Sequence, residues 1–241
     1  IPALRGVDLE LYQREAICII GPNGAGKTTL AHVIAGIMRP AGGRVVFSGQ
    51  VVSSLRPSRV PQHGIAIVLE GRHIFAEQSV RVNLELGAYW RRLGRAQIEE
   101  EVRRVYEIFP DLERHERRPA GDLSGGQQQM LGVARALMGA PRMLILDEPS
   151  MGLSPKLAGD LYAALTSLRD AGLAILLIEQ NAELAFDFCT RGYVLQHGRI
   201  ALQGTVDALR ATDLVHRIYL GVERLAEPAP AQPVTHEEEQ R

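Results

Sequence analysis

Residues 21–29 read Gly-Pro-Asn-Gly-Ala-Gly-Lys-Thr-Thr and match every fixed position of the phosphate-binding pattern G-x-x-x-x-G-K-[ST]. An apolar run at residues 16–20 precedes this stretch and a helix-like stretch at residues 28–37 follows it, which is the strand–loop–helix context that the pattern requires. In such a loop, backbone N–H groups surround phosphate oxygens at the positive end of a helix. The predicted phosphate-binding residues are Gly21, Pro22, Asn23, Gly24, Ala25, Gly26, Lys27, Thr28 and Thr29.

Two side chains of this loop have predicted roles of their own. The ammonium group of Lys27 is expected to reach the β- and γ-phosphates of a nucleotide, and the hydroxyl of Thr28 is expected to bind Mg²⁺. A glycine-rich turn with a chance lysine would explain the stretch without a ligand. The fixed glycines, the Lys-Thr pair and the flanking segments together favour the nucleotide site.

The fold class follows from short apolar segments that alternate with helical patterns. Four segments are typical of parallel strands covered on both faces, namely residues 16–20, 65–69, 143–146 and 173–178. Residues 43–48, and residues 193–196 with the turn that follows them, are expected to be strand and turn pieces toward the sheet edges. The pattern predicts an α/β fold with a mostly parallel core sheet, an antiparallel edge and covering helices.

Between residues 70 and 123 the strand pattern gives way to helical periodicity. Apolar residues recur there at helical spacing, with Glu and Arg between them: Ile98, Val102, Val105, Tyr106 and Phe109. We expect a helical subdomain over about 71–135 within a single domain spanning 1–225. The proline-rich and acidic stretch 226–241 has little to bury and is expected to be disordered.

A second nucleotide motif lies at residues 143–149, where the apolar run Met-Leu-Ile-Leu ends in Asp147-Glu148-Pro149. A buried strand delivers its terminal acid to the phosphate-binding edge of such a sheet. Asp147 is expected to hold Mg²⁺, directly or through water, and Glu148 to polarise the water that attacks the γ-phosphate. A guanine-reading Asn/Thr-Lys-x-Asp string does not occur in the sequence, which favours ATP over GTP.

A third motif, Leu-Ser-Gly-Gly-Gln at residues 123–127, precedes a helical run at 128–138. A serine at a helix start, followed by two glycines, exposes backbone N–H groups toward an anion. A second phosphate-binding element on one chain is useful if it serves a nucleotide that is bound on another chain.

Along the chain the order is phosphate loop, helical stretch, Leu-Ser-Gly-Gly-Gln motif and Asp-Glu strand. With its motifs in this order, the sequence resembles the ATP-binding cassette (ABC) ATPases, which are P-loop NTPases, over residues 1–222. The resemblance implies two subunits paired head to tail, with each ATP between the phosphate loop of one and the Leu-Ser-Gly-Gly-Gln signature of the other. The signature residues that it assigns to the nucleotide are Ser124, Gly125, Gly126 and Gln127. The family's adenine-stacking aromatic precedes the segment matching Ile1, and Tyr12 is expected to pack on the sheet instead.

Two positions differ from most of the family and indicate a smaller group within it. Glu70 replaces the usual loop Gln, within Glu70-Gly71-Arg72, and Gln180 replaces the usual switch His, within Glu179-Gln180-Asn181. Both strings are similar to those of one ATP-binding subunit of branched-chain amino acid importers, a pattern that importers of urea and short amides share. Gln180 can still donate a hydrogen bond to a γ-phosphate oxygen, and Glu70 could still contact Mg²⁺ or a bound water. A slow, degenerate site is the alternative reading.

The implied function is ATP hydrolysis that powers import, at the cytoplasmic face of the inner membrane. The implied partners are a second ATPase subunit, either a sister or a second copy, integral permease subunits and, indirectly, a solute-binding protein. Phe75 and Arg72 would lie on the permease-facing surface, although Phe75 equally fits the core of the helical subdomain. A non-transport ABC ATPase and a regulatory subunit that barely hydrolyses ATP are the rival functions.

Composition agrees with this assignment. The formal net charge of −1 gives no whole-chain field that would attract nucleic acid, and no apolar run approaches the length of a membrane span. Cys18 and Cys189 are expected to be small core residues rather than a disulfide or a metal site.

Overall fold

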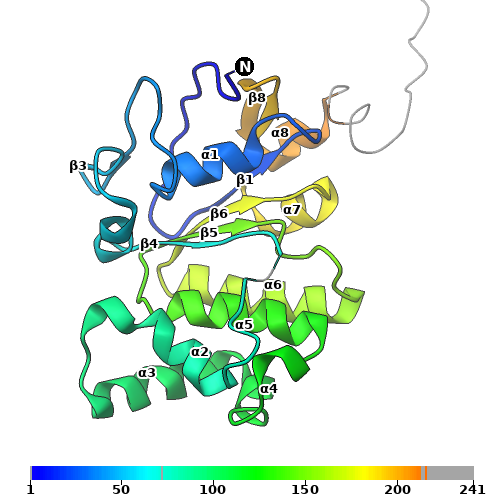
Figure 1. Ribbon diagram of the computed structural model, residues 1–241. Coiled ribbons are helices and arrows are strands. Elements are labelled where there is room, and N and C mark those ends of the chain that lie inside the picture. The colour runs from blue at the N-terminus through cyan, green and yellow to red at the C-terminus, as the bar shows by residue number, and fades with distance from the viewer. Residues whose placement is uncertain (1, 72, 213–214, 216–241) are drawn as a thin grey trace, which may run out of the picture.

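The computed structural model describes residues 2–71, 73–212 and 215 and places a six-stranded sheet at the centre of the molecule (Figure 1). The strand order is β4-β5-β6-β1-β7-β8; all neighbours are parallel except β7 and β8, which are antiparallel. The strands are β1 (Ala16–Ile20), β4 (Ile65–Val68), β5 (Met143–Asp147), β6 (Ala174–Ile178), β7 (Arg191–Gln196) and β8 (Arg199–Thr205). The predicted α/β class, with a mostly parallel sheet and an antiparallel edge, is confirmed.

Alternate residues of the central strands pack on opposite faces of the sheet. In β1, Cys18 and Ile20 belong to one apolar cluster, whereas Ile17 and Ile19 belong to another. Every residue of β1, β5 and β6 is buried, because helices cover both faces and leave no face for polar side chains. This double coverage is why these strands are apolar throughout.

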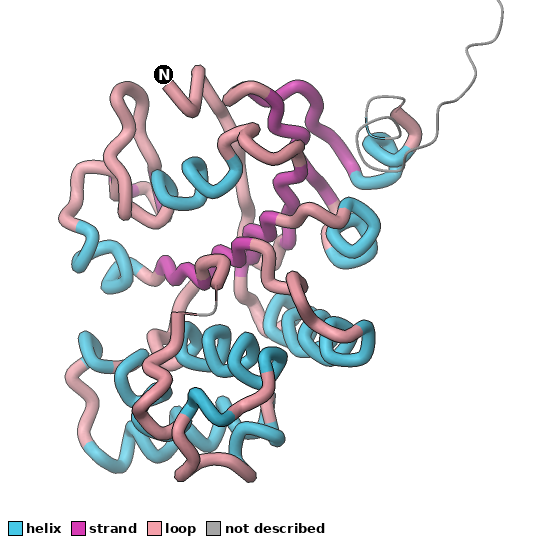
Figure 2. The backbone as a smooth tube through the Cα atoms, turned by 45° about the vertical axis from the view of Figure 1, so that its right-hand side comes forward, coloured by secondary structure: helices cyan, strands magenta, loops and turns pink. Residues whose placement is uncertain are grey.

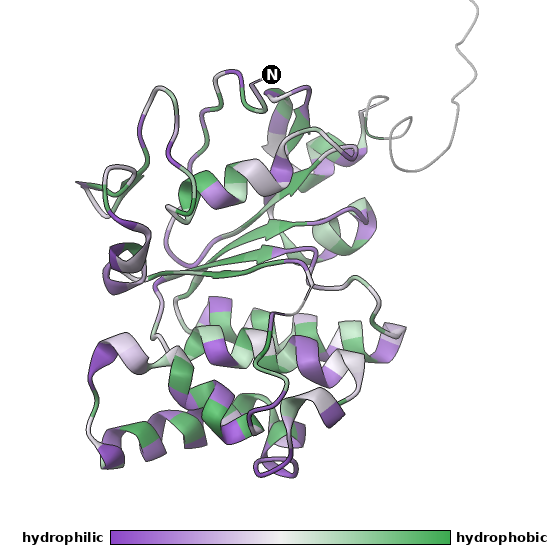
Figure 3. Ribbon diagram, viewed as in Figure 1, coloured by the Kyte–Doolittle hydropathy of each residue, from purple (hydrophilic) through white to green (hydrophobic). Residues whose placement is uncertain are grey.

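Helices lie on both sides of the sheet, with α1 on one side and α5 and α6 on the other (Figures 1 and 2). The helices are α1 (Lys27–Ile34), α2 (Val80–Gly87), α3 (Arg95–Ile108), α4 (Pro110–Glu113), α5 (Gly125–Leu137), α6 (Pro155–Asp170), α7 (Ala182–Phe188) and α8 (Val206–Arg210). Short 3₁₀ turns occur at η1 (Pro57–His63), η2 (Tyr89–Arg91) and η3 (Ala120–Asp122). Coloured by hydropathy, the central strands of the sheet are almost uniformly apolar and the outer helices are two-faced (Figure 3).

The described residues between β4 and α5 form helices α2, α3 and α4 and short 3₁₀ turns joined by loops, with one isolated β-bridge between Ser79 and Pro119. Val102, Val105 and Tyr106 of α3 are buried. Helix α2 packs closely on α5, since a Cβ on Gly87 would collide with the carbonyl oxygen of Arg135. These helices form the lower body of the molecule in Figure 1.

Two expectations about the sheet margins are wrong and one is confirmed. Within residues 43–48 only β2 (Val46–Phe47) is a strand, and it pairs with β3 (Gln50–Val51) in a separate two-stranded sheet. Strand β7 contains residues 193–196 and lies toward the edge of the main sheet, as predicted, beside the edge strand β8. Tyr12 lies in no strand and is 59% exposed, with the guanidinium of Arg191 over its ring, so it is a surface residue and not a packed one.

Other predictions fall partly or wholly outside the described residues. Arg72 and the tail 226–241 are among the residues that the structure does not describe.

Cys18 and Cys189 are buried free thiols, as predicted. In the described part of the chain, none of the helices combines the length and the apolar character that crossing a membrane requires.

Candidate functional site

The phosphate loop connects the carboxyl end of β1 to the first residue of α1. Gly26 caps α1 with φ of 107°, a left-handed conformation that favours glycine. A Cβ on Gly21 would collide with the carbonyl oxygen of Leu195 in β7. No acidic side chain occupies the first turn of α1, so its N-terminal N–H groups and partial positive charge are available to an anion.

The ammonium group of Lys27 lies over this loop. The side chain is 6% exposed, and Nζ donates hydrogen bonds to the carbonyl oxygens of Gly21, at 2.8 Å, and Pro22, at 3.4 Å. Among the described residues, no carboxylate lies within ion-pair distance of Lys27. A buried positive charge with only carbonyl partners is well matched to a phosphate group.

Asp147, the last residue of β5, carries the clearest sign of a missing ligand. Its side chain is 1% exposed, and neither carboxylate oxygen has a hydrogen-bond partner. Burial raises the pKa of Asp147 and Glu70 raises it further, whereas Thr28, His32 and Lys27 lower it. The Thr28 hydroxyl is therefore close to the carboxyl, without the geometry of a hydrogen bond.

These features fit a divalent cation. Buried carboxylates without partners are rare, and cation binding is one way to satisfy them. Among the described residues no group of three or more His, Cys, Asp and Glu side chains could hold a metal ion. Mg²⁺ is commonly held by one or two protein ligands together with phosphate oxygens and waters, and Asp147 with Thr28 provides such a set. Mg²⁺ would supply positive charge there that stabilises negative charge on phosphate oxygens.

Glu148 follows Asp147 and has a strained backbone, with φ of 50°. Its N–H donates to the carbonyl oxygen of Ile178 at the end of β6, at 2.9 Å. Burial raises the pKa of the Glu148 carboxyl, with further contributions from Glu70, Asp147 and Glu179, while Lys27 lowers it. A carboxyl with a raised pKa is the better proton acceptor.

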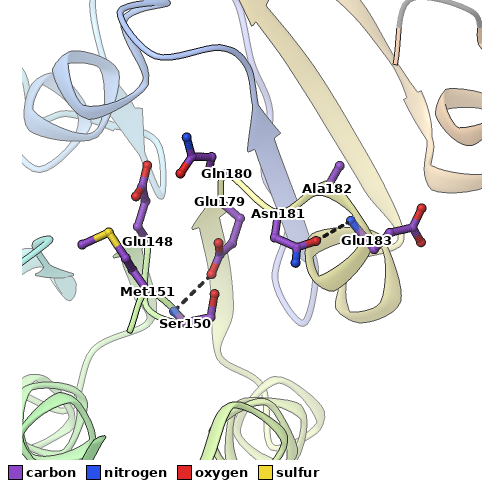
Figure 4. Close-up of a pocket in the computed structure, with 8 residues that line it drawn as sticks. All are labelled: Glu148, Ser150, Met151, Glu179, Gln180, Asn181, Ala182 and Glu183. Atoms are coloured by element: carbon purple, nitrogen blue, oxygen red, sulfur yellow. Dashed lines mark hydrogen bonds between the residues drawn. The ribbon is translucent and has the colours of Figure 1, made fainter. Parts of the chain in front are cut away.

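A hollow of about 400 Å³ opens beside Glu148. Figure 4 shows that the end of β5 and the segment after β6 contribute its walls. Its lining comprises Glu148, Ser150, Met151, Glu179, Gln180, Asn181, Ala182 and Glu183. The structure thus brings Glu148 and Gln180 to one hollow, although they are far apart in sequence.

Gln180 connects this hollow to the phosphate loop. Its side chain is exposed, and Nε2 donates to Oδ1 of Asn23 at 3.2 Å. Glu70 is exposed just after β4, and its charge acts on both Asp147 and Glu148. The predicted residues of the loop, the Asp-Glu pair, Glu70 and Gln180 therefore gather at the carboxyl ends of neighbouring strands.

The signature residues lie elsewhere. Ser124 caps α5, where its Oγ accepts from the N–H of Gln127 at 3.3 Å and Gln127 Oε1 accepts from the N–H of Ser124 at 3.0 Å. A Cβ on Gly126 would collide with Leu157 of α6. Within the described chain, no hydrogen bond or ion pair joins residues 124–127 to residues 21–29.

The loop after Glu70 presents an aromatic ring. Phe75 is 50% exposed, which excludes the alternative that it belongs to the subdomain core. The guanidinium of Arg135 lies 5.3 Å from the ring centroid, and Arg135 Nη2 donates to the carbonyl oxygen of His73. Asn83, fully buried, accepts from the Phe75 N–H at 2.9 Å and donates to the Phe75 carbonyl oxygen at 3.0 Å.

Sequence reasoning missed two residues of this region, Glu179 and Tyr162. Glu179 was noted only as the neighbour of Gln180, and Tyr162 lies in α6. The hydroxyl of Tyr162 donates to Glu179 at 2.9 Å, and Glu179 is 2% exposed. A glutamate directly after an apolar strand was the available signal, since buried carboxylates need partners.

Comparisons with known proteins agree with this geometry. The ABC transporter family model matches residues 4–151. The branched-chain amino acid transport ATP-binding protein BraG of Pseudomonas aeruginosa is 40% identical over 92% of this chain and 94% of its own length. The lipopolysaccharide export ATP-binding protein LptB of Haemophilus influenzae is 33% identical over 89% of each chain. The ADP conformation of MJ1267, an ATP-binding cassette of an ABC transporter, has a TM-score of 0.80 at 29% identity, over 91% and 93% of the two chains.

Proposed function

The chain belongs to the ABC transporter family as an ATPase domain, and we propose that it hydrolyses ATP to power uptake of branched-chain amino acids. The observation that carries the hydrolytic part is Asp147, whose two buried oxygens have no partner beside the phosphate loop. That arrangement is costly in the protein alone and favourable with a cation and a nucleotide.

In this proposal the phosphate loop, Lys27 and the residues around it bind the ATP phosphates. Lys27 exchanges the carbonyl oxygens of Gly21 and Pro22 for β- and γ-phosphate oxygens, and Thr28 and Asp147 hold Mg²⁺. Glu70 contributes through a bound water or by direct contact. The site needs little covalent chemistry, because positioning and electrostatic stabilisation dominate phosphoryl transfer.

Glu148 and Gln180 act at the γ-phosphate. Glu148 orients the attacking water and accepts its proton as the bond between the γ-phosphorus and the bridging oxygen breaks, leaving ADP and phosphate. Gln180 leaves Asn23 and donates its amide N–H to a γ-phosphate oxygen. An amide cannot supply the positive charge of an imidazolium, so Lys27 carries more of the charge stabilisation here.

The site is completed by a second ATPase subunit, paired head to tail. Ser124, Gly125 and Gly126 of one subunit would contact the γ-phosphate held by the other, with Gln127 fixing the turn. The absence of a link between residues 124–127 and the phosphate loop within the described chain supports a role in trans. Loss of the γ-phosphate would remove the bridging contacts and reopen the pair.

The surface around Phe75 is the proposed contact for a membrane permease. Asn83 fixes the loop backbone, and Arg135 holds the ring from one side. An exposed aromatic ring on a rigid backbone is suited to a partner interface, because little entropy is lost on contact. The chain would then sit at the cytoplasmic face of the inner membrane, linked indirectly to a solute-binding protein and not to nucleic acid.

The solute assignment is supported by the resemblance at Glu70 and Gln180 and by the 40% identity to BraG. Urea, short amides and other amino-acid-like solutes are alternatives within the same role. A non-transport ABC ATPase is the alternative outside it. The 33% identity to LptB shows how widely this domain is shared among transport systems.

The test uses the chain assembled with the permease encoded beside it, in sealed proteoliposomes with the matching binding protein. ATP turnover of wild type is compared with that of Glu148→Gln, and uptake of labelled leucine with that of urea and acetamide. We expect Glu148→Gln to lose turnover while retaining ATP-driven pairing. Equal turnover would remove the role of Glu148, and uptake of urea or acetamide without leucine would replace the proposed solute.

A further inference from the structure

A buried carboxylate, Glu179, lines the same hollow as the proposed catalytic Glu148. Glu179 follows β6, is 2% exposed, and has no ion-pair partner among the described residues. Its Oε1 atom accepts two hydrogen bonds, from the Ser150 N–H at 3.2 Å and from the Tyr162 hydroxyl at 2.9 Å. Figure 4 shows the first of these bonds crossing from Glu179 to the turn after Glu148.

That turn has an unfavourable backbone conformation. Glu148 has φ of 50°, which an L-residue adopts only where the surrounding structure over-determines it. Two hydrogen bonds from adjacent residues of the β6 end restrain the turn: Ile178 binds the Glu148 N–H at 2.9 Å, and Glu179 binds the Ser150 N–H two residues later. The strained residue is therefore held on both sides.

The hydroxyl of Tyr162 orients the carboxylate of Glu179. Its ring packs against Phe188, with centroids 5.4 Å apart, and burial raises the pKa of its hydroxyl, followed by the effect of Glu179. The hydroxyl therefore remains protonated and donates to Glu179 throughout the neutral range. Helices α6 and α7 thus support the orientation of Glu179.

We propose that Glu179 is a positioning residue for ATP hydrolysis, which holds Glu148 in its strained orientation through the Ser150 N–H and is itself oriented by Tyr162. The inference rests on the proposed role of Glu148. It predicts an effect on turnover that is separate from nucleotide binding, because Lys27 and Thr28 belong to another element, α1.

The experiment compares Glu179→Ala, Glu179→Gln and Tyr162→Phe with wild type in the permease-assembled transporter. Glu179→Ala is expected to lower kcat by about 10- to 100-fold, as for a misplaced reacting group, while KM for ATP changes by less than about threefold. Glu179→Gln retains the acceptor oxygen and should recover kcat to within about fivefold of wild type. Tyr162→Phe should lower kcat by about two- to fivefold.

Glu183→Gln is the matched control, because Glu183 lines the same hollow but is exposed at the start of α7. It should change neither kcat nor KM for ATP. Equal kcat for Glu179→Ala and wild type, per folded protein, would overturn the inference, as would Glu179→Gln failing like Glu179→Ala. If Glu179→Ala does not fold, wild-type kcat in Tyr162→Phe would overturn it. Glu148→Gln is measured in parallel, so that undiminished turnover in that variant identifies failure of the proposed function itself.

Discussion

Polar side chains lack protein partners at the carboxyl edge of the sheet, where β5 and the phosphate loop end, but have them in the helical body formed by α2 to α5. At the edge, Asp147 has no partner for either oxygen and Lys27 has only carbonyl partners. In the helical body, Asn83 makes four hydrogen bonds and the Ser124–Gln127 pair is closed on itself. The edge is stabilised by what it binds, whereas the helical body is stabilised internally and is available as a rigid surface.

The largest expected effect tests the edge. Lys27→Ala should lower ATP turnover by at least about 100-fold, because a preorganised positive charge is lost from the transferring phosphate. Lys156, the other lysine of the chain, is exposed in α6 and provides the control. Turnover and ATP binding are measured for both alanine variants. Equal losses in the two would show that net charge matters rather than the position of the loop lysine.

The next effect tests the helical body. Asn83→Ala leaves the Phe75 N–H without its partner and removes one of the two hydrogen bonds that each of the Phe75, Gln78 and Ser79 carbonyl oxygens accepts. The free energy of unfolding should fall by about 2–4 kcal/mol, since several buried groups lose a bond at once. Urea denaturation measures this, with exposed Gln62→Ala as the control. ATP binding by the folded fraction should be unchanged, and a loss of binding would mean that the two regions are coupled.

Asp147→Asn is expected to stabilise the fold, in contrast to Asn83→Ala. The pKa of Asp147 is raised in the folded state, so its ionised form destabilises the fold as pH rises above the ordinary value of about 3.9. Without Mg²⁺, the amide should raise the free energy of unfolding at neutral pH by about 1–3 kcal/mol. Below pH 3.9 both forms are neutral and the difference should vanish. Thermal unfolding at pH 7.5 and 3.5 measures it.

The same substitution should weaken the Mg²⁺-dependent part of ATP binding. Titration calorimetry with and without Mg²⁺ separates this part from binding by the phosphate loop. A variant that is less stable than wild type in Mg²⁺-free buffer would contradict the picture of an edge that needs its ligand. It would indicate that Asp147 is satisfied within the protein.

What the sequence predicts well is set by local chemistry. The sequence predicts three central strands correctly, at residues 16–20, 143–146 and 173–178, because strands that are buried on both faces contain apolar residues throughout. It predicts the turn at Gly26 because the left-handed backbone conformation there favours glycine. The sequence also predicts that Asp147 and Lys27 lie at one edge of the sheet, because each belongs to a motif that ends or follows a buried strand. Their roles stay predictions.

The contacts that the sequence does not predict depend on strand register and on the packing of helices. Glu179 meets Ser150 and Tyr162 across 29 and 17 residues, so its role emerges only when β6 and α6 are placed. From the sequence, Phe75 fits a core position and a surface position equally. The structure distinguishes them, because Asn83 and Arg135 hold its loop at the surface. Tyr12 precedes an apolar strand, yet its backbone turns before the strand begins and leaves the ring exposed under Arg191.

The smallest effect sharpens the comparison at the signature. Ser124 caps α5 and Ser79 caps α2, each accepting a hydrogen bond from the N–H three residues later. Replacing either with alanine should lower the free energy of unfolding by about 1 kcal/mol, the usual loss for a cap. Only Ser124→Ala should also weaken ATP-driven pairing of subunits, measured by analytical ultracentrifugation in a Glu148→Gln background. Equal pairing in the two variants would mean that Ser124 serves its own helix alone, and that the signature does not reach a partner's nucleotide.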